Sequence, residues 1–139
     1  MPSLDDDEQR RRVAAAPVGR LATLRADGTP RLGPVTFVLV DGMLWSAVDD
    51  VKPKRDKRLA RLADVGRDAR AALLVDHYAD DWSALWWVRI DAVAEVRDAR
   101  DAGPALAALA SKYPAYRTAP PPGPVLVLTP TRWTGWSAS

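Results

Sequence analysis

The clearest structural signal lies in residues 18–48, which read VGRLATLRADGTPRLGPVTFVLVDGMLWSAV. Apolar and polar residues alternate in residues 18–25, and residues 32–40 are rich in β-branched and other apolar side chains. The dipeptides Asp27-Gly28 and Asp41-Gly42 separate these runs, and Asp-Gly between such segments is a strong signal for a tight β-hairpin turn. The sequence therefore predicts three consecutive antiparallel strands, a β-meander.

Periodicity also predicts the elements on either side of the meander. Leu59, Leu62 and Ala63 fall on one face of a helix at about residues 54–65. The other predicted elements are a helix within residues 1–16 that Ser3 caps, strands at 71–78, 85–97 and 125–136 with an edge or a bulge at Pro130, and a helix at about 102–112.

These elements add up to a mainly β fold. About six antiparallel strands with two or three helices, in this order, predict a small β-barrel with flanking helices that cover its ends. The 139 residues, 47% of them hydrophobic, are enough for one core, and no linker-like stretch divides the chain. We therefore expect a single domain over residues 1–139, with the helix of residues 1–16 at its periphery.

The composition excludes several kinds of catalytic site. The chain has no cysteine and one histidine, His77, so a Cys/His zinc site or a Ser-His-Asp hydrolase is hard to build, and no metal site is predicted. The glycines form neither a dinucleotide-binding fingerprint nor a P-loop. His77 is interpreted as a structural residue that could also donate a proton, and the pairs Asp49-Asp50 and Asp80-Asp81 as turn or capping residues.

Charge and hydropathy bear on location and partners. The 20 basic and 18 acidic residues give a net charge of +2, which is small for a nucleic-acid-binding domain. No apolar run approaches the roughly 18 residues of a membrane span, and the first residues have no signal-peptide pattern. We expect a cytoplasmic protein with no nucleic-acid or membrane partner.

The strongest candidate for a ligand site is the basic run Lys52-Pro53-Lys54-Arg55, followed by Lys57 and Arg58. It lies where the predicted helix begins, and main-chain N–H groups at a helix N-terminus and cationic side chains both favour a phosphate. A solvated basic face is the alternative interpretation. A nucleic-acid site is less favoured, because no aromatic residues are interleaved with these cations.

Tryptophan is the second suggestive feature. Trp82, Trp86 and Trp87 lie within six residues, and Trp133 and Trp136 are close to the end of the chain. Indole rings bury large areas in cores and interfaces and can also stack on planar ligands. In the alternating pattern of residues 85–97, Trp86 falls on the core face, whereas Trp87 and Arg89 share the polar face and are candidates for a pocket wall.

Five segments resemble one family. They are Val18-Gly19-Arg20-Leu21-Ala22-Thr23, Pro34-Val35-Thr36-Phe37, Asp49-Asp50-Val51-Lys52-Pro53-Lys54, Leu74-Val75-Asp76-His77-Tyr78 and Leu85-Trp86-Trp87-Val88-Arg89. Together they are similar to the pyridoxamine 5′-phosphate oxidase-like split-barrel superfamily, and more narrowly to its actinobacterial branch of F420-dependent enzymes. The likeness extends from about residue 17 to residue 136.

The resemblance implies a six-stranded antiparallel, FMN-binding type of split barrel that forms a homodimer with its cofactor at the subunit interface. It assigns Lys52, Lys54, Arg55 and Arg58 to the cofactor phosphate. It places Val35, Thr36 and Phe37 against the ring system, whose polar edge their main-chain groups can pair with. Trp87 and Arg89 would border the groove, often from the other subunit.

The implied activity is that of an F420-dependent oxidoreductase that transfers hydride between the reduced deazaflavin and an electrophilic small molecule. The resemblance assigns no catalytic side chain, because the cofactor carries this chemistry. FMN is the alternative cofactor, and a non-catalytic protein that binds a flavin or a tetrapyrrole is the alternative function. The chain lacks the carboxy-terminal substrate-binding segment of true pyridoxamine-phosphate oxidases, so vitamin B6 oxidation is not expected.

Overall fold

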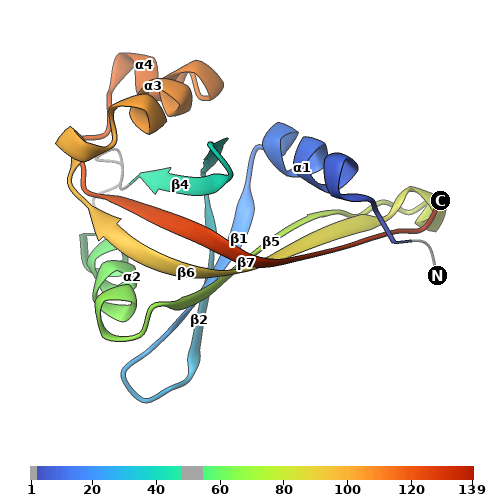
Figure 1. Ribbon diagram of the computed structural model, residues 1–139, viewed down its shortest axis with the longest axis horizontal. Helices are drawn as coiled ribbons and strands as arrows, with labels where there is room; N and C mark the ends of the chain where they lie inside the picture. The colour runs from blue at the N-terminus through green and yellow to red at the C-terminus, as the bar shows by residue number, and fades with distance from the viewer. Residues whose placement is uncertain (1–2, 48–54) are drawn as a thin grey trace.

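A computed structural model describes residues 3–47 and 55–139, with side chains from residue 60 onward in the second range. Seven strands form one antiparallel sheet in the order β2-β1-β5-β6-β7-β4-β3 (Figure 1). Their bounds are β1 Gly19–Leu24, β2 Pro30–Val35, β3 Val38–Val40, β4 Met43–Ala47, β5 Arg70–His77, β6 Trp86–Arg97 and β7 Val125–Ser137. The predicted mainly β class with flanking helices is confirmed.

The strand count differs from the predicted six because the segment of residues 32–40 is two strands. It breaks at Thr36 and Phe37, which connect β2 to β3. β2 and β3 are the two outermost strands of the sheet order, so this connection brings the ends of the sheet together. The bend therefore allows the sheet to curve around a core instead of lying flat.

One of the two predicted turns is tight as expected, whereas the Asp27-Gly28 hairpin is wider, because the last strand pair is Leu24 with Pro30 and only Gly28 of the dipeptide has a positive φ. Asp41 and Gly42 have φ values of 53° and 77°, and two consecutive positive φ values are the signature of a type I′ hairpin turn. Pro130 lies at a bulge, because Asp91 pairs with Arg132 whereas Ala92 pairs with Pro130. Thr131 is the extra residue, and its hydroxyl donates to the carbonyl of Asp91 over 3.1 Å. The prediction of an edge or bulge at this proline is confirmed.

Four helices flank the sheet: α1 Asp6–Ala15, α2 Arg55–Arg67, α3 Gly103–Lys112 and α4 Ala115–Thr118. Two short 3-10 turns, η1 Trp82–Ala84 and η2 Ala99–Asp101, complete the described elements. Ser3 was expected to cap α1, but the cap is Asp5, whose carboxylate accepts from the Glu8 N–H over 2.8 Å. Asp5 is the acceptor because it directly precedes the first helical turn.

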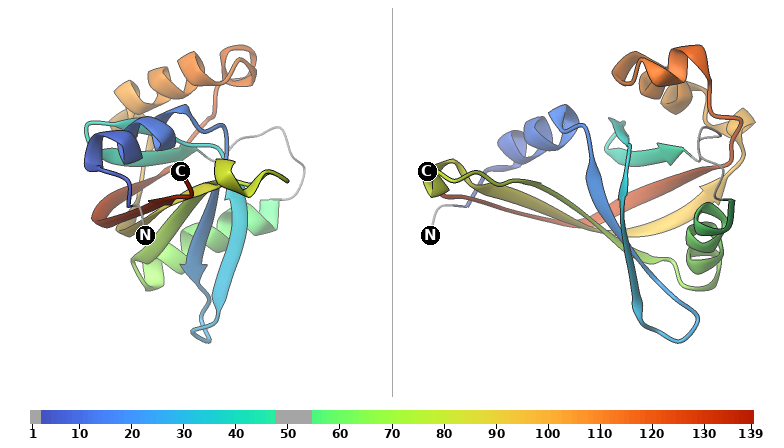
Figure 2. Two further views of the ribbon diagram at one scale, coloured as in Figure 1. Left: turned by 90° about the vertical axis from the view of Figure 1, so that its right-hand side faces the viewer. Right: turned by 180° about the vertical axis from the view of Figure 1, so that it is seen from behind.

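The outer halves of the long strands β5, β6 and β7 extend beyond the barrel as an arm, which ends near the C-terminus (Figure 2). α1 packs along one side of this arm. The Arg10 guanidinium lies 4.6 Å from the Trp133 ring centroid, and that of Arg12 lies 5.1 Å from the Trp86 centroid. Trp86 therefore faces α1 and the interior, as its position in the alternation predicts.

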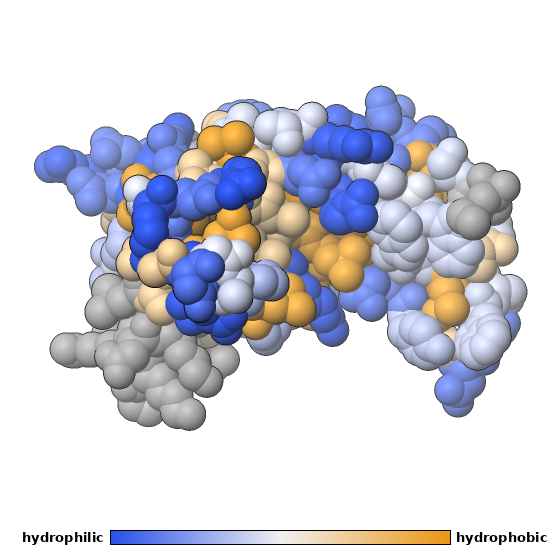
Figure 3. Space-filling view, turned by 90° about the horizontal axis from the view of Figure 1, so that it is seen from below, coloured by the Kyte–Doolittle hydropathy of each residue, from blue (hydrophilic) through white to orange (hydrophobic). Residues whose placement is uncertain are grey.

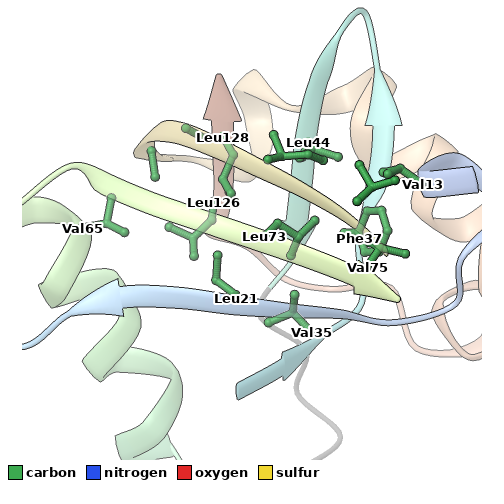
Figure 4. Close-up of a cluster of buried hydrophobic side chains, with 14 residues drawn as sticks. Val13, Leu21, Val35, Phe37, Leu44, Val65, Leu73, Val75, Leu126 and Leu128 are labelled. Carbon is green, nitrogen blue, oxygen red and sulfur yellow. The ribbon is translucent and has the colours of Figure 1, made fainter. Parts of the chain in front are cut away.

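Two apolar clusters hold the molecule together. The larger lies inside the curved sheet and combines side chains from the strands with Val13 of α1 and Val65 of α2 (Figure 4). The smaller lies between the sheet and the α3–α4 pair, where Leu109 and Tyr116 pack against Val38, Trp45 and neighbouring residues of β3, β4 and β7. The α3–α4 pair thus covers the sheet beside the bend at Thr36 and Phe37.

A buried carboxylate attaches α2 to the β1–β2 hairpin. The Asp64 side chain is 2% exposed, and it accepts from the Thr23 hydroxyl over 2.8 Å and from Arg31 Nε over 2.6 Å. Burial alone would raise the pKa of Asp64, but hydrogen bonds from Arg31 and Thr23, together with the positive charges of Arg31 and Arg67, lower it below its ordinary 3.8. Asp64 is therefore ionised and paired in the folded protein.

Candidate functional site

The predicted phosphate-binding residues fall at the edge of what the structure describes. Lys52 and Lys54 lie outside the described residues. Arg55 is the first residue of α2, and Arg58 lies in its first turn. In this helix the structure describes side chains only from residue 60 onward, so it does not place those of Arg55 and Arg58. The structure thus begins a helix at Arg55, the last residue of the run Lys52-Pro53-Lys54-Arg55, and the phosphate assignment itself stays a prediction.

The predicted ring-binding residues form the bend between β2 and β3. Val35 is 7% exposed and Phe37 is 1% exposed, and both side chains belong to the core inside the barrel. Thr36 is half-buried and points the other way, with its hydroxyl 2.6 Å from the Tyr116 hydroxyl. Only main-chain groups of Val35 and Phe37 could therefore meet a ligand, which agrees with the expectation that the main chain makes these contacts.

Most polar groups of the bend already have partners inside the protein. Ser46 Oγ donates to the Thr36 carbonyl over 2.7 Å. The Phe37 N–H donates to the Tyr113 hydroxyl over 3.1 Å, and the Phe37 carbonyl accepts from Lys112 Nζ over 2.9 Å. Within the described residues, the Thr36 N–H is left as a main-chain donor with no partner. A ligand that contacts the bend would find this donor available.

Lys112, Tyr113 and Tyr116, which we call the Tyr113 cluster, were not predicted from the sequence. They come from the end of α3 and from α4, about 75 to 80 positions away along the chain from the bend. Burial lowers the pKa of Lys112 from 10.5 to about 8 and raises that of Tyr113 above 10.0. The Lys-Tyr-Pro-Ala-Tyr sequence has no periodic signal that would distinguish it from an ordinary helix end.

Trp87 and Arg89 lie on the outer face of β6, opposite the core. The Arg89 guanidinium is 5.8 Å from the Trp87 ring centroid and 3.8 Å from the Asp91 carboxylate. Trp87 is paired across the strands with Trp136 of β7, whose indole N–H is buried without a partner in the described part of the chain. This surface combines aromatic faces and a guanidinium.

The bend and the Trp87–Arg89 surface are not adjacent within one chain. The cross-strand pairs Pro34–Arg20, Arg20–Leu74 and Leu74–Arg89 form one row over four strands. Neighbouring strands are about 4.8 Å apart, so the two ends of this row are about 14 Å apart. Pro34, which precedes the bend, and Arg89 thus lie on one face of the sheet but far apart, and the structure does not bring the two sets of predicted residues together into a single pocket.

The cavity that adjoins the predicted bend residues is too small for a planar cofactor. The cavity inside the barrel, lined by Val35, Phe37, Leu73 and other core side chains, has a volume of about 10 Å³, enough for about one water molecule. An open depression of about 510 Å³ is lined by residues 98–100 and 122–124, which include none of the predicted site residues. A planar cofactor would therefore have to bind on the outer surface.

That outer face also carries exposed apolar side chains. Leu32 is 70% exposed, Leu74 is 36% exposed and Val93 is 50% exposed. Leu32 and Leu74 lie in neighbouring cross-strand rows, and Val93 lies one row beyond on β6. Apolar surface is visible in the middle of the molecule in Figure 3, among polar regions. Such surface commonly marks an interaction site.

Comparison with known proteins identifies the family. Residues 5–137 match the family described as pyridoxamine 5′-phosphate oxidase. The chain belongs to the pyridoxamine 5′-phosphate oxidase family. The resemblance inferred from the sequence is thus confirmed at the level of the split-barrel superfamily. No curated protein matches the chain.

Several solved structures show the same fold at low sequence identity. A conserved hypothetical protein from Mycobacterium tuberculosis has a TM-score of 0.77 at 20% identity, over 97% of this chain and 86% of that one. A FAD-binding protein from Mesorhizobium loti has a TM-score of 0.71 at 17% identity, over 96% and 95%. HutZ, a heme storage protein from Vibrio cholerae, has a TM-score of 0.68 at 15% identity, over 95% and 93%.

Among the described residues, no helix is both long enough and apolar enough to cross a bilayer.

Proposed function

We propose that this member of the pyridoxamine 5′-phosphate oxidase family is an F420-dependent oxidoreductase that works as a homodimer in the cytoplasm. It would transfer hydride between the reduced deazaflavin and an electrophilic small molecule. The observation that carries the proposal is the outer face of the sheet, which holds the Trp87–Arg89 surface and exposed leucines and ends at the bend. A second copy on this face would turn the open surface into a groove between subunits.

The residues of the chain fit a phosphate-bearing, planar cofactor. α2 begins at Arg55, within the run of cationic residues, and a helix N-terminus with cations around it suits a phosphate. The Thr36 N–H has no partner among the residues that the structure describes and could pair with a ring carbonyl or nitrogen, and the Trp87 indole offers a face for stacking. Arg89 adds a positive charge beside that indole, which favours an anionic or electron-rich ligand.

The cofactor, when bound, supplies the hydride chemistry, so the protein need not provide a nucleophile. In the proposed site Lys52, Lys54, Arg55 and Arg58 hold the phosphate, while Val35, Thr36 and Phe37 orient the ring through their main-chain groups. Trp87 and Arg89 of the second copy close the groove and exclude water. One well-aimed donor, such as the Thr36 N–H, contributes up to a few kcal/mol by stabilising negative charge that develops on the ring.

Two alternatives keep the same surface. FMN has a tricyclic ring and a phosphate like F420, and the similar protein from Mesorhizobium loti is described as FAD-binding. A non-catalytic flavin or tetrapyrrole carrier is the second alternative, because the similar HutZ is a heme storage protein. Saturable binding without turnover of enones or quinones would favour this second alternative.

A fluorescence titration of ligand-free protein with F420, FMN and haem tests the proposal. We expect F420 to bind most tightly. Replacing both Lys52 and Lys54 by alanine should weaken that binding at least about a hundredfold, because two charge-assisted hydrogen bonds are lost. The matched control is Arg11→Ala with Arg100→Ala, which removes the same charge from side chains that are 71% and 83% exposed. Unchanged binding by the lysine variant would refute the phosphate assignment.

A further inference from the structure

The Tyr113 cluster contacts the bend through several hydrogen bonds as well as through apolar packing. Tyr113 is the residue that directly follows α3, and its hydroxyl accepts from the Phe37 N–H over 3.1 Å. The same hydroxyl lies 2.9 Å from the Pro17 carbonyl and 3.0 Å from the Phe37 carbonyl, so its single proton is donated to one of these oxygens at a time. Tyr113 thus connects three separate segments: the end of α3, the link before β1 and the bend.

Lys112 complements Tyr113 at the same carbonyl. Its Nζ is 2.9 Å from the Phe37 carbonyl, 4.1 Å from the centroid of the Phe37 ring and 5.3 Å from that of Tyr113. In the described part of the chain no carboxylate pairs with this amine. The partners of this half-buried lysine are a main-chain carbonyl and two aromatic rings. Lys112 therefore binds the bend and does not form a surface ion pair with a described residue.

Tyr116 fixes the other residue of the bend. Its hydroxyl is 2.6 Å from the Thr36 hydroxyl, and its ring packs edge-on against Tyr113 with 5.6 Å between centroids. The ring is buried, with 4% of its surface exposed. The three side chains therefore act as one unit on two consecutive residues, Thr36 and Phe37.

Within residues 3–47 and 55–139, one main-chain group of the bend has no hydrogen-bond partner. A bend between two strands loses the cross-strand hydrogen bonds of a regular ladder, and its polar groups need other partners. The Tyr113 cluster and Ser46 supply partners for the Thr36 carbonyl and for both polar groups of Phe37. What remains is the Thr36 N–H, whose orientation depends on the conformation that these contacts impose.

We propose that Lys112, Tyr113 and Tyr116 are positioning residues that hold Thr36 and Phe37 in the conformation that binds the cofactor ring. The proposal rests on the proposed function, because it concerns the segment assigned to the ring. It adds that the end of α3, which contributes no residue to the predicted site, sets the affinity of that site through the main chain of the bend.

Two variants and their matched controls test this proposal. Tyr113→Phe removes only the hydroxyl, and Tyr78→Phe makes the same change at a tyrosine that is 71% exposed. Lys112→Met removes the amine, whereas Lys112→Arg retains a cation and a donor at the same place. The readouts are hydrogen–deuterium exchange at the Phe37 amide, measured without ligand, and the Kd for F420 and for FMN from fluorescence titration.

We expect the Phe37 amide of Tyr113→Phe to exchange at least about tenfold faster than in the wild type, because its acceptor is lost. The Kd of the ligand that the wild type binds should rise about threefold to tenfold, the range of one hydrogen bond. Lys112→Met should weaken binding similarly and Lys112→Arg should recover most of the loss. Tyr78→Phe should leave both readouts unchanged, which separates positioning from a general loss of stability.

The outcomes separate this proposal from the function on which it rests. If the wild type binds neither F420 nor FMN, the proposed function is refuted and the positioning role is refuted with it. If the wild type binds and Tyr113→Phe and Lys112→Met bind equally well, only the positioning role is refuted, whatever the exchange at Phe37. Faster exchange together with weaker binding in both variants would establish it.

Discussion

Replacing Asp64 by alanine should strongly destabilise the protein, because this carboxylate joins α2 to the β1–β2 hairpin. The change removes the acceptor of the Thr23 hydroxyl, 2.8 Å away, and of Arg31 Nε, 2.6 Å away. Thr23 is 2% exposed and would be left with a buried, unpaired hydroxyl, whereas the Arg31 side chain is 30% exposed and can turn to water.

The size of the loss follows from these exposures. An unsatisfied buried hydroxyl costs about 1–3 kcal/mol, and a hydrogen bond to a charged group contributes about 1.5–3 kcal/mol. Since Arg31 recovers part of its solvation, we expect a total loss of about 3 kcal/mol, near the lower end for breaking a buried ion pair. For a domain of 139 residues this corresponds to a fall in Tm of roughly 10 °C.

Urea denaturation at pH 7 measures the loss, with Asp80→Ala at an exposed aspartate as the control. A double-mutant cycle with Thr23→Val should give a coupling energy of about 1 kcal/mol between the two residues. Because the pKa of Asp64 is lowered in the folded state, its contribution is present above pH 3.8 and is lost as the pH falls through the folded-state pKa. A loss below about 1 kcal/mol, or a wild-type advantage that does not shrink between pH 5 and pH 3, would refute this reasoning.

Three further predictions concern other parts of the molecule. Burial lowers the pKa of Lys112 to about 8, so above pH 8 the unfolded chain binds more protons at this residue than the folded chain does. The unfolding free energy of the wild type, measured relative to that of Lys112→Met, should therefore rise between pH 8 and pH 9.5. The rise should be up to about 1 kcal/mol for this half-exposed group. Urea titrations in which the two proteins differ by the same free energy at every pH would contradict this. Tyr113 does not interfere, since burial raises its pKa above 10.0. Gly123→Ala should cost at least about 2 kcal/mol, because Gly123 has a φ of +86° and the new methyl group would lie 2.6 Å from the Ala99 side chain; thermal unfolding measures it, and a loss below about 0.5 kcal/mol would show that the loop relaxes easily. Leu74→Asp on the outer face should convert the proposed dimer into a monomer in light scattering without lowering the Tm of the monomer, and an unchanged dimer would exclude this face as the interface.

Elements with a local signal were predictable from the sequence. The Asp41-Gly42 turn, the long strand β6 and the bulge beside Pro130 each depend on residues next to one another in the chain. Turn geometry, side-chain alternation and the missing N–H of proline all act within a few residues. These features therefore appear in the structure where the sequence places them.

The break at Thr36 and Phe37 was not predictable in this way. Residues 35–40 carry uninterrupted β-type side chains, and nothing among them signals that β2 ends at Val35. The Tyr113 and Tyr116 hydroxyls and the Lys112 amine supply hydrogen-bond partners for the polar groups of the bend. These groups are distant in the sequence and reach the bend only when α3 packs on the sheet. The sequence therefore indicates that this segment matters, without indicating what shapes it.

The site shows the same division between local and distant information. The basic run before α2 is a local pattern, and the structure begins the helix at Arg55, within one residue of the predicted start. The pairing of Trp87 with Trp136, and the row that separates Pro34 from Arg89, depend on strand order and register. The spacing of residues along one strand predicts neither this pairing nor this separation. The sequence could therefore identify the bend residues and the Trp87–Arg89 pair as candidates, but not the distance between them.

That separation is the strongest physical reason to place the cofactor between two copies of the chain. A ring that contacts the Thr36 N–H and stacks on Trp87 of the same copy would have to span about 14 Å across four strands of a continuous sheet face. If two copies meet through this face instead, each bend can approach the partner's copy of the Trp87–Arg89 surface, and the exposed leucines between them become buried. The same contact would thus complete the site and cover Leu32 and Leu74, so loss of the dimer and loss of cofactor binding should occur together in Leu74→Asp.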